Sequence, residues 1–319
     1  MAFSGLLRPA LLAASRSPRV ERAITRAATT KKLVDRFVAG ETEGDAVDAA
    51  SALLGSGRCV TIDYLGEDTT DFDHARATVA HYLRLLSALA ELRATDQAPV
   101  PLLEVSLKLS ALGQSLPQNG YAIAREHAYE ICTAAKAAGV WVTVDAEDHT
   151  TTDATLSIVR ELRLDFPWLG TVLQAYLKRT EDDCRTFAGP GSRIRLCKGA
   201  YREPASVAYQ SRSAVDESYL RCLRILMDGK GYPMIATHDP ALIDAALRHV
   251  WESGRKSGDF EFQMLHGIRD AEQRRLAAAG HALRVYVPYG DQWYGYFMRR
   301  LAERPANIAF FLRSFGRDR

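Results

Sequence analysis

Short runs of strand-forming residues alternate with helical stretches eight times along this chain. The runs lie at 59–65, 102–107, 140–146, 171–176, 193–197, 234–237, 260–265 and 283–287. Helical stretches follow them, for example at 73–93, 123–138, 152–164 and 215–228, with apolar residues every three or four positions. Strands that are separated by helices pair in parallel. Eight such units predict a (β/α)8 barrel of the α/β class, and a doubly wound sheet is the alternative.

The length of 319 residues suits one such barrel with a small extension. We expect residues 1–57 to form an N-terminal helical extension and residues 58–319 to form a distorted barrel, with a final helix over the barrel mouth. In the leader, arginines from Arg8 to Arg26 sit among Ala, Leu and Ser. Mitochondrial transit peptides share this pattern, but a basic helical extension is favoured because Ala and Arg are abundant throughout the chain.

The composition excludes several classes of protein. The 41 basic and 39 acidic residues leave a net charge of +2, which gives no drive toward nucleic acid. The apolar runs are far shorter than the roughly 20 residues of a membrane-spanning helix, so we expect a soluble protein. The five cysteines are well separated and form no C-x-x-C pair. They therefore predict neither a disulfide framework nor a zinc site, and they favour a reducing compartment.

Chemically functional residues close almost every predicted strand. In a (β/α)8 barrel the functional groups lie at the carboxyl ends of the strands. These positions hold Glu67, Lys108, Asp145, Gln174, Arg195, Lys198, Thr237, His238, Leu265, His266 and Tyr286. A solvated strand end would explain any one of them, but chemistry this varied at so many ends predicts a site. Metal-ligand spacings, a nucleophile elbow and a phosphate-binding glycine loop are all missing from the sequence.

The last predicted helix, around residues 292–303, carries a polar face. Tyr296, Arg299, Arg300 and Glu303 are spaced so that they share one side of a helix. Two guanidinium groups beside a tyrosine form a fork that matches the two oxygens of a carboxylate. An exposed charged stripe, with Glu303 paired to an arginine, is the alternative. The position of this helix after the eighth strand favours ligand binding.

The motifs around these residues resemble those of the proline dehydrogenase family, in the family's order from about residue 58 to residue 315. They are SLKLSAL at 106–112, VDAE at 144–147, LQAY at 173–176, RLCKGAY at 195–201, ATH at 236–238, FEFQMLHG at 260–267 and the closing set of Tyr296, Arg299, Arg300 and Glu303. The resemblance implies a distorted (β/α)8 barrel with FAD over the strand ends. It also implies oxidation of L-proline to Δ1-pyrroline-5-carboxylate by hydride transfer to flavin N5, with the electrons passed to a quinone. This reaction is the first step of proline catabolism to glutamate.

The resemblance also implies a role for each matching residue. Arg299 and Arg300 pair with the proline carboxylate, and Asp145 and Arg195 are the catalytic charges, with Arg195 near flavin N5. Lys108 contacts the substrate. Apart from the resemblance, we expect Lys108 and Asp145 to form an ion pair that holds the floor of the pocket. The walls of the substrate pocket are Leu265, Tyr201, Tyr286 and Tyr296. The FAD site comprises Ala146, Gln174, Arg195, Lys198, Gly199, Ala200, Thr237, His238 and Glu303. Glu67 is the gating partner of Arg299.

Two positions depart from the family pattern, namely Arg202 and the pair Val215-Asp216. They put the contacts to the ribityl and adenine groups of FAD in question, but not the oxidation of proline. The chain has no aldehyde dehydrogenase half, and its length favours the monofunctional bacterial form over the mitochondrial enzymes. No His or Cys stands in a flavinylation motif, so we expect non-covalent FAD. We expect a cytoplasmic protein whose basic leader contacts the inner face of the cell membrane peripherally.

Two other functions fit the same residues. A barrel lyase or aldolase would use Lys108 or Lys198 as a Schiff-base amine, since both lysines close strands. A non-catalytic barrel would hold a carboxylate with Arg299 and Arg300 alone. The dehydrogenase is favoured because cations near a flavin, Arg195 above all, stabilise the negative charge that develops as the flavin is reduced.

Overall fold

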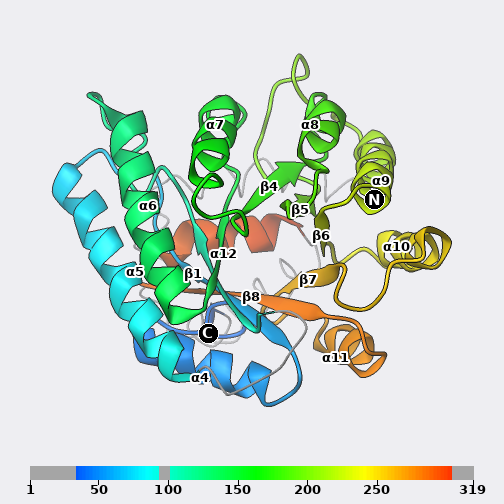
Figure 1. Ribbon diagram of the computed structural model, residues 1–319, viewed down its shortest axis with the longest axis horizontal. Coiled ribbons are helices and arrows are strands. Elements are labelled where there is room, and N and C mark those ends of the chain that lie inside the picture. The colour runs from blue at the N-terminus through cyan, green and yellow to red at the C-terminus, as the bar shows by residue number, and fades with distance from the viewer. Residues whose placement is uncertain (1–33, 93–100, 304–319) are drawn as a thin grey trace, which may run out of the picture.

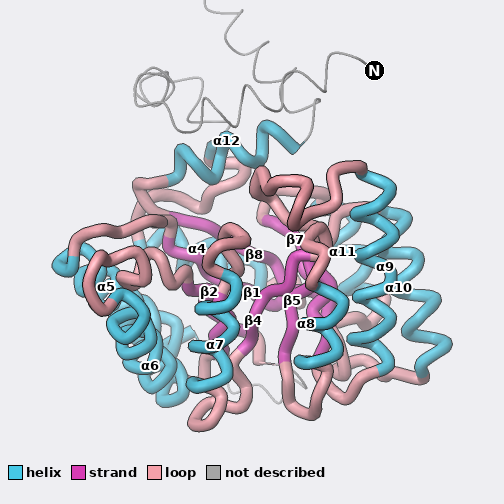
Figure 2. Tube along the Cα trace, turned by 90° about the horizontal axis from the view of Figure 1, so that it is seen from above, coloured by secondary structure: helices cyan, strands magenta, loops and turns pink. Residues whose placement is uncertain are grey.

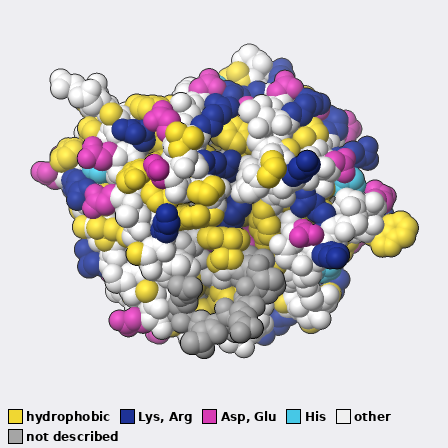
Figure 3. All heavy atoms as spheres, in the orientation of Figure 1, with side chains coloured by type: hydrophobic (Ala, Val, Ile, Leu, Met, Phe, Trp, Pro, Cys, Tyr) yellow, Lys and Arg dark blue, Asp and Glu magenta, His cyan; other side chains and the backbone are white. Residues whose placement is uncertain are grey.

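The computed structural model describes residues 34–92 and 101–303 of the protein. The arginines of the leader, from Arg8 to Arg26, lie outside the described residues. Among the described helices, none combines the length and apolar character needed to cross a membrane. On the face shown in Figure 3, basic and acidic side chains are interspersed over the described surface, in keeping with the near balance of charge.

Eight parallel strands close into a barrel in chain order (Figure 1). They are β1 (Cys59–Tyr64), β2 (Leu103–Leu107), β3 (Trp141–Val144), β4 (Gly170–Gln174), β5 (Arg193–Cys197), β6 (Tyr232–Ala236), β7 (Glu261–Leu265) and β8 (Leu283–Tyr289). The closure is made by β1 and β8, where Val60 pairs with Val285 and Ile62 with Val287. The (β/α)8 prediction is therefore confirmed, and the doubly wound alternative is wrong because its sheet would stay open.

Some strand limits differ from those predicted. The run at 140–146 includes Asp145 and Ala146, but β3 ends at Val144 because β4 pairs only with Thr143 and Val144. The run at 171–176 likewise loses its last two residues to the loop after β4. In both places the residues that leave the strand enter the loops at the carboxyl end of the barrel, where functional groups gather.

Helices cover the outside of the barrel. They are α5 (Phe72–Leu92), α6 (Gly120–Ala138), α7 (Thr152–Leu162), α8 (Thr180–Phe187), α9 (Arg212–Asp228), α10 (Pro240–Ser253) and α11 (Asp270–Ala278). The longest, α5, buries Val79, Tyr82, Leu86 and Leu89, whose spacing of three and four residues makes one apolar face toward the strands. Asp239 caps α10 by accepting a hydrogen bond from the Ala241 amide, and Pro240 occupies the first turn.

Two helices distort the regular pattern. After β8 the chain does not return to the outside of the barrel; instead α12 (Trp293–Glu303) crosses one end of it (Figure 2). An earlier helix, α4 (Glu43–Leu54), packs on the outside against β1 and β8. The final helix therefore lies over the barrel mouth, as predicted.

A short segment before α4 supports α12. Val34, Phe37 and Val38 are buried against Phe297 and Met298 of that helix. The segment also passes close to Gly267, where a Cβ atom would lie 1.7 Å from the Arg36 carbonyl oxygen, so only glycine fits. Residues 34–54 thus pack against the barrel and its cap, while the proposed domain boundary at residue 57 stays a prediction.

Candidate functional site

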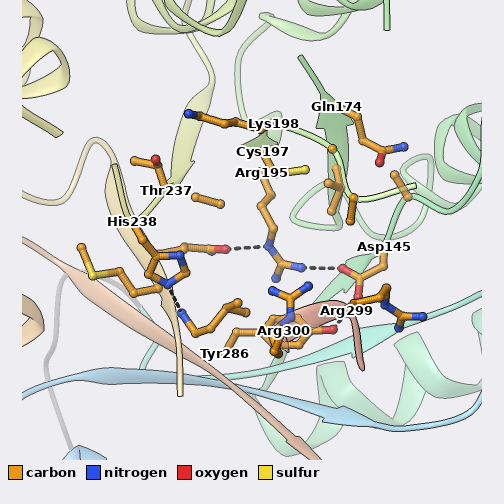
Figure 4. A pocket seen from close by; sticks show the side chains of 18 of the residues that line it. Asp145, Gln174, Arg195, Cys197, Lys198, Thr237, His238, Tyr286, Arg299 and Arg300 are labelled. Carbon is orange, nitrogen blue, oxygen red and sulfur yellow. Dashed lines mark hydrogen bonds and ion pairs between the residues drawn. The ribbon is translucent and has the colours of Figure 1, made fainter. Parts of the chain in front are cut away.

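A cavity of about 700 Å³ opens at the carboxyl end of the barrel. Every residue to which the family resemblance assigns a role, and whose side chain the structure describes, lines it; Glu303 belongs to α12, but its side chain lies outside the description. Of the strand-end residues predicted to form the site, His266 does not line the cavity. The predicted residues brought together are Glu67, Lys108, Asp145, Ala146, Gln174, Arg195, Lys198, Gly199, Ala200, Tyr201, Thr237, His238, Leu265, Tyr286, Tyr296, Arg299 and Arg300. Figure 4 shows Asp145 and Arg195 pointing toward one another within this group.

Sequence reasoning missed several residues of the cavity wall. They are Asp63, Val172, Cys197, Arg212, Ala236, Asp239, Pro240, Gln263 and Met264. Asp63 and Gln263 carried a usable signal. Each stands two residues after another polar side chain of its strand, Thr61 and Glu261, and all four are buried. Because helices cover the outer face of the barrel, alternate polar residues in a strand must face the interior.

Lys108 is held as a cation by two carboxylates. Its Nζ donates to Asp63 Oδ1 and Oδ2, both at 2.8 Å, and lies 3.6 Å from Asp145 Oδ2. The expected Lys108–Asp145 pair is therefore present only as the longer contact, and Asp63 is the main partner. Burial alone would lower the pKa of Lys108, but the charges of Asp63 and Asp145 outweigh it and raise the pKa above its ordinary value.

Arg195 lies at the floor of the cavity and is hydrogen-bonded at all three of its side-chain nitrogens. Its Nε donates to Gln263 Oε1 at 2.6 Å, and its Nη1 donates to Asp145 Oδ1 and to Ser106 Oγ at 3.1 Å. Its Nη2 donates to Glu104 Oε1 at 2.9 Å. Asp145 also accepts a hydrogen bond from the Tyr286 hydroxyl at 2.7 Å. These contacts fix one cation and one carboxylate side by side in the cavity.

The side chains of α12 cover the opposite wall. Arg299 Nη2 donates to Glu67 Oε1 at 2.7 Å, and the Arg300 guanidinium lies 5.0 Å from the centre of the Tyr296 ring. The expected contact between the loop after β1 and α12 is thus present. Capping of α5 does not involve Glu67, because Asp71 accepts the hydrogen bond from the His74 amide there.

The remaining residues of the cavity are fixed by their own partners. Lys198 Nζ lies 2.5 Å from Asp216 Oδ1 and 3.0 Å from Asp239 Oδ2. Gln174 donates to the Glu147 carbonyl at 2.8 Å, and His238 Nε2 accepts from the Leu265 amide at 2.9 Å. The loop after β5 turns at Gly199, which has φ +109°, and a Cβ atom there would lie 2.3 Å from the Tyr176 ring. Only glycine therefore fits at this point of the wall.

A buried carboxyl group, Glu147, ties two loops of the site together. It accepts a hydrogen bond from the Ser110 amide at 3.1 Å and pairs with the Ser110 hydroxyl. Burial raises the pKa of Glu147 to about 7, although both hydrogen bonds oppose this change. The group therefore titrates near neutral pH, well above the usual range for glutamate.

This pKa predicts a loss of stability on raising the pH. An unfolded glutamate has a pKa of about 4.3, so the folded protein binds more protons between about pH 4.3 and pH 7. Protonated Glu147 stabilises the fold fully below this window, and that contribution is lost as the pH rises through it. The free energy of unfolding, measured with urea, should fall from pH 5 to pH 8 by roughly 3 kcal/mol more in the wild type than in Glu147→Gln. Equal losses in the two proteins would contradict the assignment.

Comparison with known proteins gives the same family. The family model for proline dehydrogenase matches residues 46–313. Proline dehydrogenase 1 of Bacillus subtilis is 40% identical over 278 residues, which cover 87% of this chain and 89% of that protein. The proline dehydrogenase of Deinococcus radiodurans is 39% identical over 307 residues, or 96% of each chain.

A solved structure shows the same fold. Proline utilization A from Bdellovibrio bacteriovorus superposes with a TM-score of 0.79 at 22% identity, and the match covers 86% of this chain and 33% of that one. With the family model and two relatives that match along nearly their whole length, the chain belongs to the proline dehydrogenase family.

Proposed function

We propose that this proline dehydrogenase binds FAD non-covalently in the cavity, together with L-proline, and oxidises the substrate to Δ1-pyrroline-5-carboxylate. The observation that carries the proposal is Arg195, a cation locked in the cavity floor and facing the same space as the two arginines of α12. The Arg195 cation suits a cofactor that gains negative charge, and the paired guanidinium groups of Arg299 and Arg300 suit a carboxylate.

The cavity fits a flavin dinucleotide. Its volume of about 700 Å³ is in the range of cofactor sites and is larger than proline alone would fill. Gly199 keeps the wall clear where a side chain would strike Tyr176. Lys198 and Arg212 supply cations for a diphosphate, and both line the cavity. The other proposed FAD contacts are Ala146, Gln174, Ala200, Thr237, His238 and Glu303.

The side chains divide the work of catalysis. Bound FAD supplies the acceptor for the hydride that leaves proline C5. Arg299 and Arg300 bind the proline carboxylate and thereby orient the ring. Arg195 presents positive charge, and Asp145 keeps Arg195 in place. Tyr201, Leu265 and Tyr286 exclude water from the substrate.

The aldolase alternative is not favoured by the state of its lysines. A Schiff-base lysine must lose its proton to attack a carbonyl. Lys108 lies between two carboxylates that raise its pKa, and Lys198 is paired with Asp216 and Asp239. A non-catalytic barrel is tested by turnover of proline with a dye acceptor.

An absorbance spectrum tests the proposal directly. The purified protein should be yellow, and L-proline added without oxygen should bleach the flavin band. Acid precipitation should release the colour into the supernatant, because no covalent bond holds it. Colourless protein that FAD does not activate would refute the proposal, and colour retained in the pellet would refute non-covalent binding.

The electron acceptor belongs to the same proposal. We infer that a quinone takes the electrons at the inner face of the cell membrane, where the basic leader makes a peripheral contact. A short-chain quinone should support proline turnover, and vesicles with anionic lipid should retain the full chain. A variant with the five leader arginines Arg8, Arg16, Arg19, Arg22 and Arg26 changed to Gln should bind the vesicles less tightly while turnover in solution persists. Equal retention of the wild type and the variant on the vesicles would count against a membrane contact by the leader.

Gating by Glu67 predicts a kinetic effect without a stability effect. The Glu67–Arg299 pair ties the loop after β1 to α12. The two side chains are 25% and 19% exposed, so water reaches the pair and it can open in each turnover. Glu67→Ala should weaken proline capture in stopped-flow flavin reduction while the thermal midpoint barely moves. Asp71→Ala is the matched control. It removes a helix cap, which should lower the thermal midpoint and leave capture intact. Unchanged reduction kinetics in Glu67→Ala would exclude the gate.

A further inference from the structure

A fully buried carboxylate lies beneath the cavity floor. The Glu104 side chain is 0% exposed and does not line the cavity. It stands on β2, on the same inward face as Ser106 and Lys108. Its Oε1 accepts hydrogen bonds from Thr61 Oγ1 at 2.8 Å and from Arg195 Nη2 at 2.9 Å, and its Oε2 pairs with Arg193. Glu104 thus holds two arginines of β5, and one of them faces the ligand space.

Glu104 completes the set of groups that immobilise Arg195. The partners of the guanidinium come from different parts of the barrel: Gln263 from β7, Asp145 from the loop after β3, and Ser106 and Glu104 from β2. A guanidinium held at all three nitrogens cannot swing toward or away from a ligand. Its distance from any ligand in the cavity is therefore set by the barrel.

Arg195 belongs to a balanced ion network inside the barrel. Within the described residues the network joins four cations and four carboxylates, and Gln263 connects its last ion pair to Arg195. The charged members are Lys108, Arg193, Arg195, Arg284, Asp63, Glu104, Asp145 and Glu261. Burial alone would raise the pKa of Glu104, but the charges of Arg193, Arg284 and Arg195 outweigh it and hold the pKa far below its ordinary value. Glu104 is therefore ionised at any working pH. Because water does not screen a buried charge, loss of this carboxylate would leave an excess positive charge beneath the cavity.

We propose that Glu104 is a positioning residue that sets the charge which Arg195 presents to the flavin, and thereby the reduction potential of the bound cofactor. This inference rests on the proposed function, since it concerns FAD in the cavity. The counter-charge of Glu104 offsets part of the positive potential of Arg195. The reduced, more negative flavin is therefore stabilised less than it would be by Arg195 alone. Glu104 thus keeps the reduction potential of the flavin low.

The variant Glu104→Gln removes the charge and keeps the shape and the Oε1 acceptor. On the FAD-loaded protein, the equilibrium constant for two-electron reduction should rise about tenfold, which is about +30 mV in midpoint potential. Sulfite, an anion that adds reversibly to flavins and bleaches them, should bind about tenfold more tightly for the same electrostatic reason. The KM for proline should stay within about twofold, because α12 is untouched.

Two control variants separate charge from packing. Glu104→Asp keeps the charge and loses a methylene, so its potential and sulfite affinity should match the wild type. Glu261→Gln removes an equally buried carboxylate, but the ion partner of Glu261 is Arg284, which does not line the cavity. The shift in midpoint potential of Glu261→Gln should be clearly smaller than that of Glu104→Gln. Equal shifts in Glu104→Gln and Glu261→Gln would overturn the specific role of Glu104.

A change of opposite sign gives an independent test that survives if Glu104→Gln does not fold. Arg193→Gln removes the cation that competes for Glu104, so the midpoint potential should fall and sulfite should bind more weakly. An unchanged or raised potential in Arg193→Gln would overturn the inference. Wild-type protein that proline does not reduce would instead refute the proposed function. If proline reduces the wild type, yet Glu104→Gln and Arg193→Gln both match its potential, this inference alone fails.

Discussion

Replacing Arg300 by Met should raise the KM for proline by about 30-fold or more, while FAD stays bound. The reason is the loss of a charge-assisted hydrogen bond to a carboxylate inside the cavity, which costs roughly 2–5 kcal/mol. Arg300 lines the cavity from α12, and its guanidinium rests against the Tyr296 ring. The spectrum of the bound flavin tests whether FAD stays bound, and steady-state kinetics with a dye acceptor give the KM for proline.

Two comparisons make the test specific to the carboxylate. Arg300→Lys keeps the charge but not the planar fork, so its KM should fall between those of the wild type and the Met variant. Pyrrolidine lacks the carboxylate, so the wild type should prefer proline over it far more strongly than Arg300→Met does. A KM within about twofold of the wild type would mean that the carboxylate anchor lies elsewhere.

Replacing Arg195 by Met should slow flavin reduction at saturating proline by about 10²–10³-fold. The barrel locks this guanidinium into the cavity floor at all three nitrogens, and removal of one preorganised charge from a site of this kind has that effect. The KM should change less than the rate, because the fork of α12 remains. Stopped-flow measurement of the flavin band reports the reduction rate directly.

Stability must be measured beside the rate, because Arg195→Met breaks the buried ion pairs of Arg195 with Glu104 and Asp145, which keep only Arg193 and the longer Lys108 contact as cationic partners. Such a loss costs about 3–5 kcal/mol and should lower the thermal midpoint. Arg195→Lys restores the charge without the four hydrogen bonds, and should recover part of both the rate and the stability. A folded Arg195→Met variant that reduces within about tenfold of the wild-type rate would remove Arg195 from the catalytic set.

The strands, the helices and the place of the site are local features of the chain. A run such as 193–197 becomes a strand because its residues alternate between a helix-covered face and an interior face, and the chain repeats this unit eight times. Parallel strands bring all their carboxyl ends to one edge, so residues as distant as Lys108 and Tyr286 meet in one cavity. Their convergence could therefore be predicted without coordinates.

The choice of partners depends on how the strands are staggered around the closed barrel, and no local pattern encodes this. Asp63 pairs in register with Ser106, two residues before Lys108, and the tilt of the strands then brings the lysine to Asp63 rather than mainly to Asp145. Glu104 on β2 reaches Arg195 on β5 only because the barrel closes around them. Likewise α12 crosses the mouth of the barrel, whereas α4 packs against β1 and β8 on the outside. The alternation along the chain determines the barrel and its functional end, whereas the closure and the strand stagger decide which charge is paired with which.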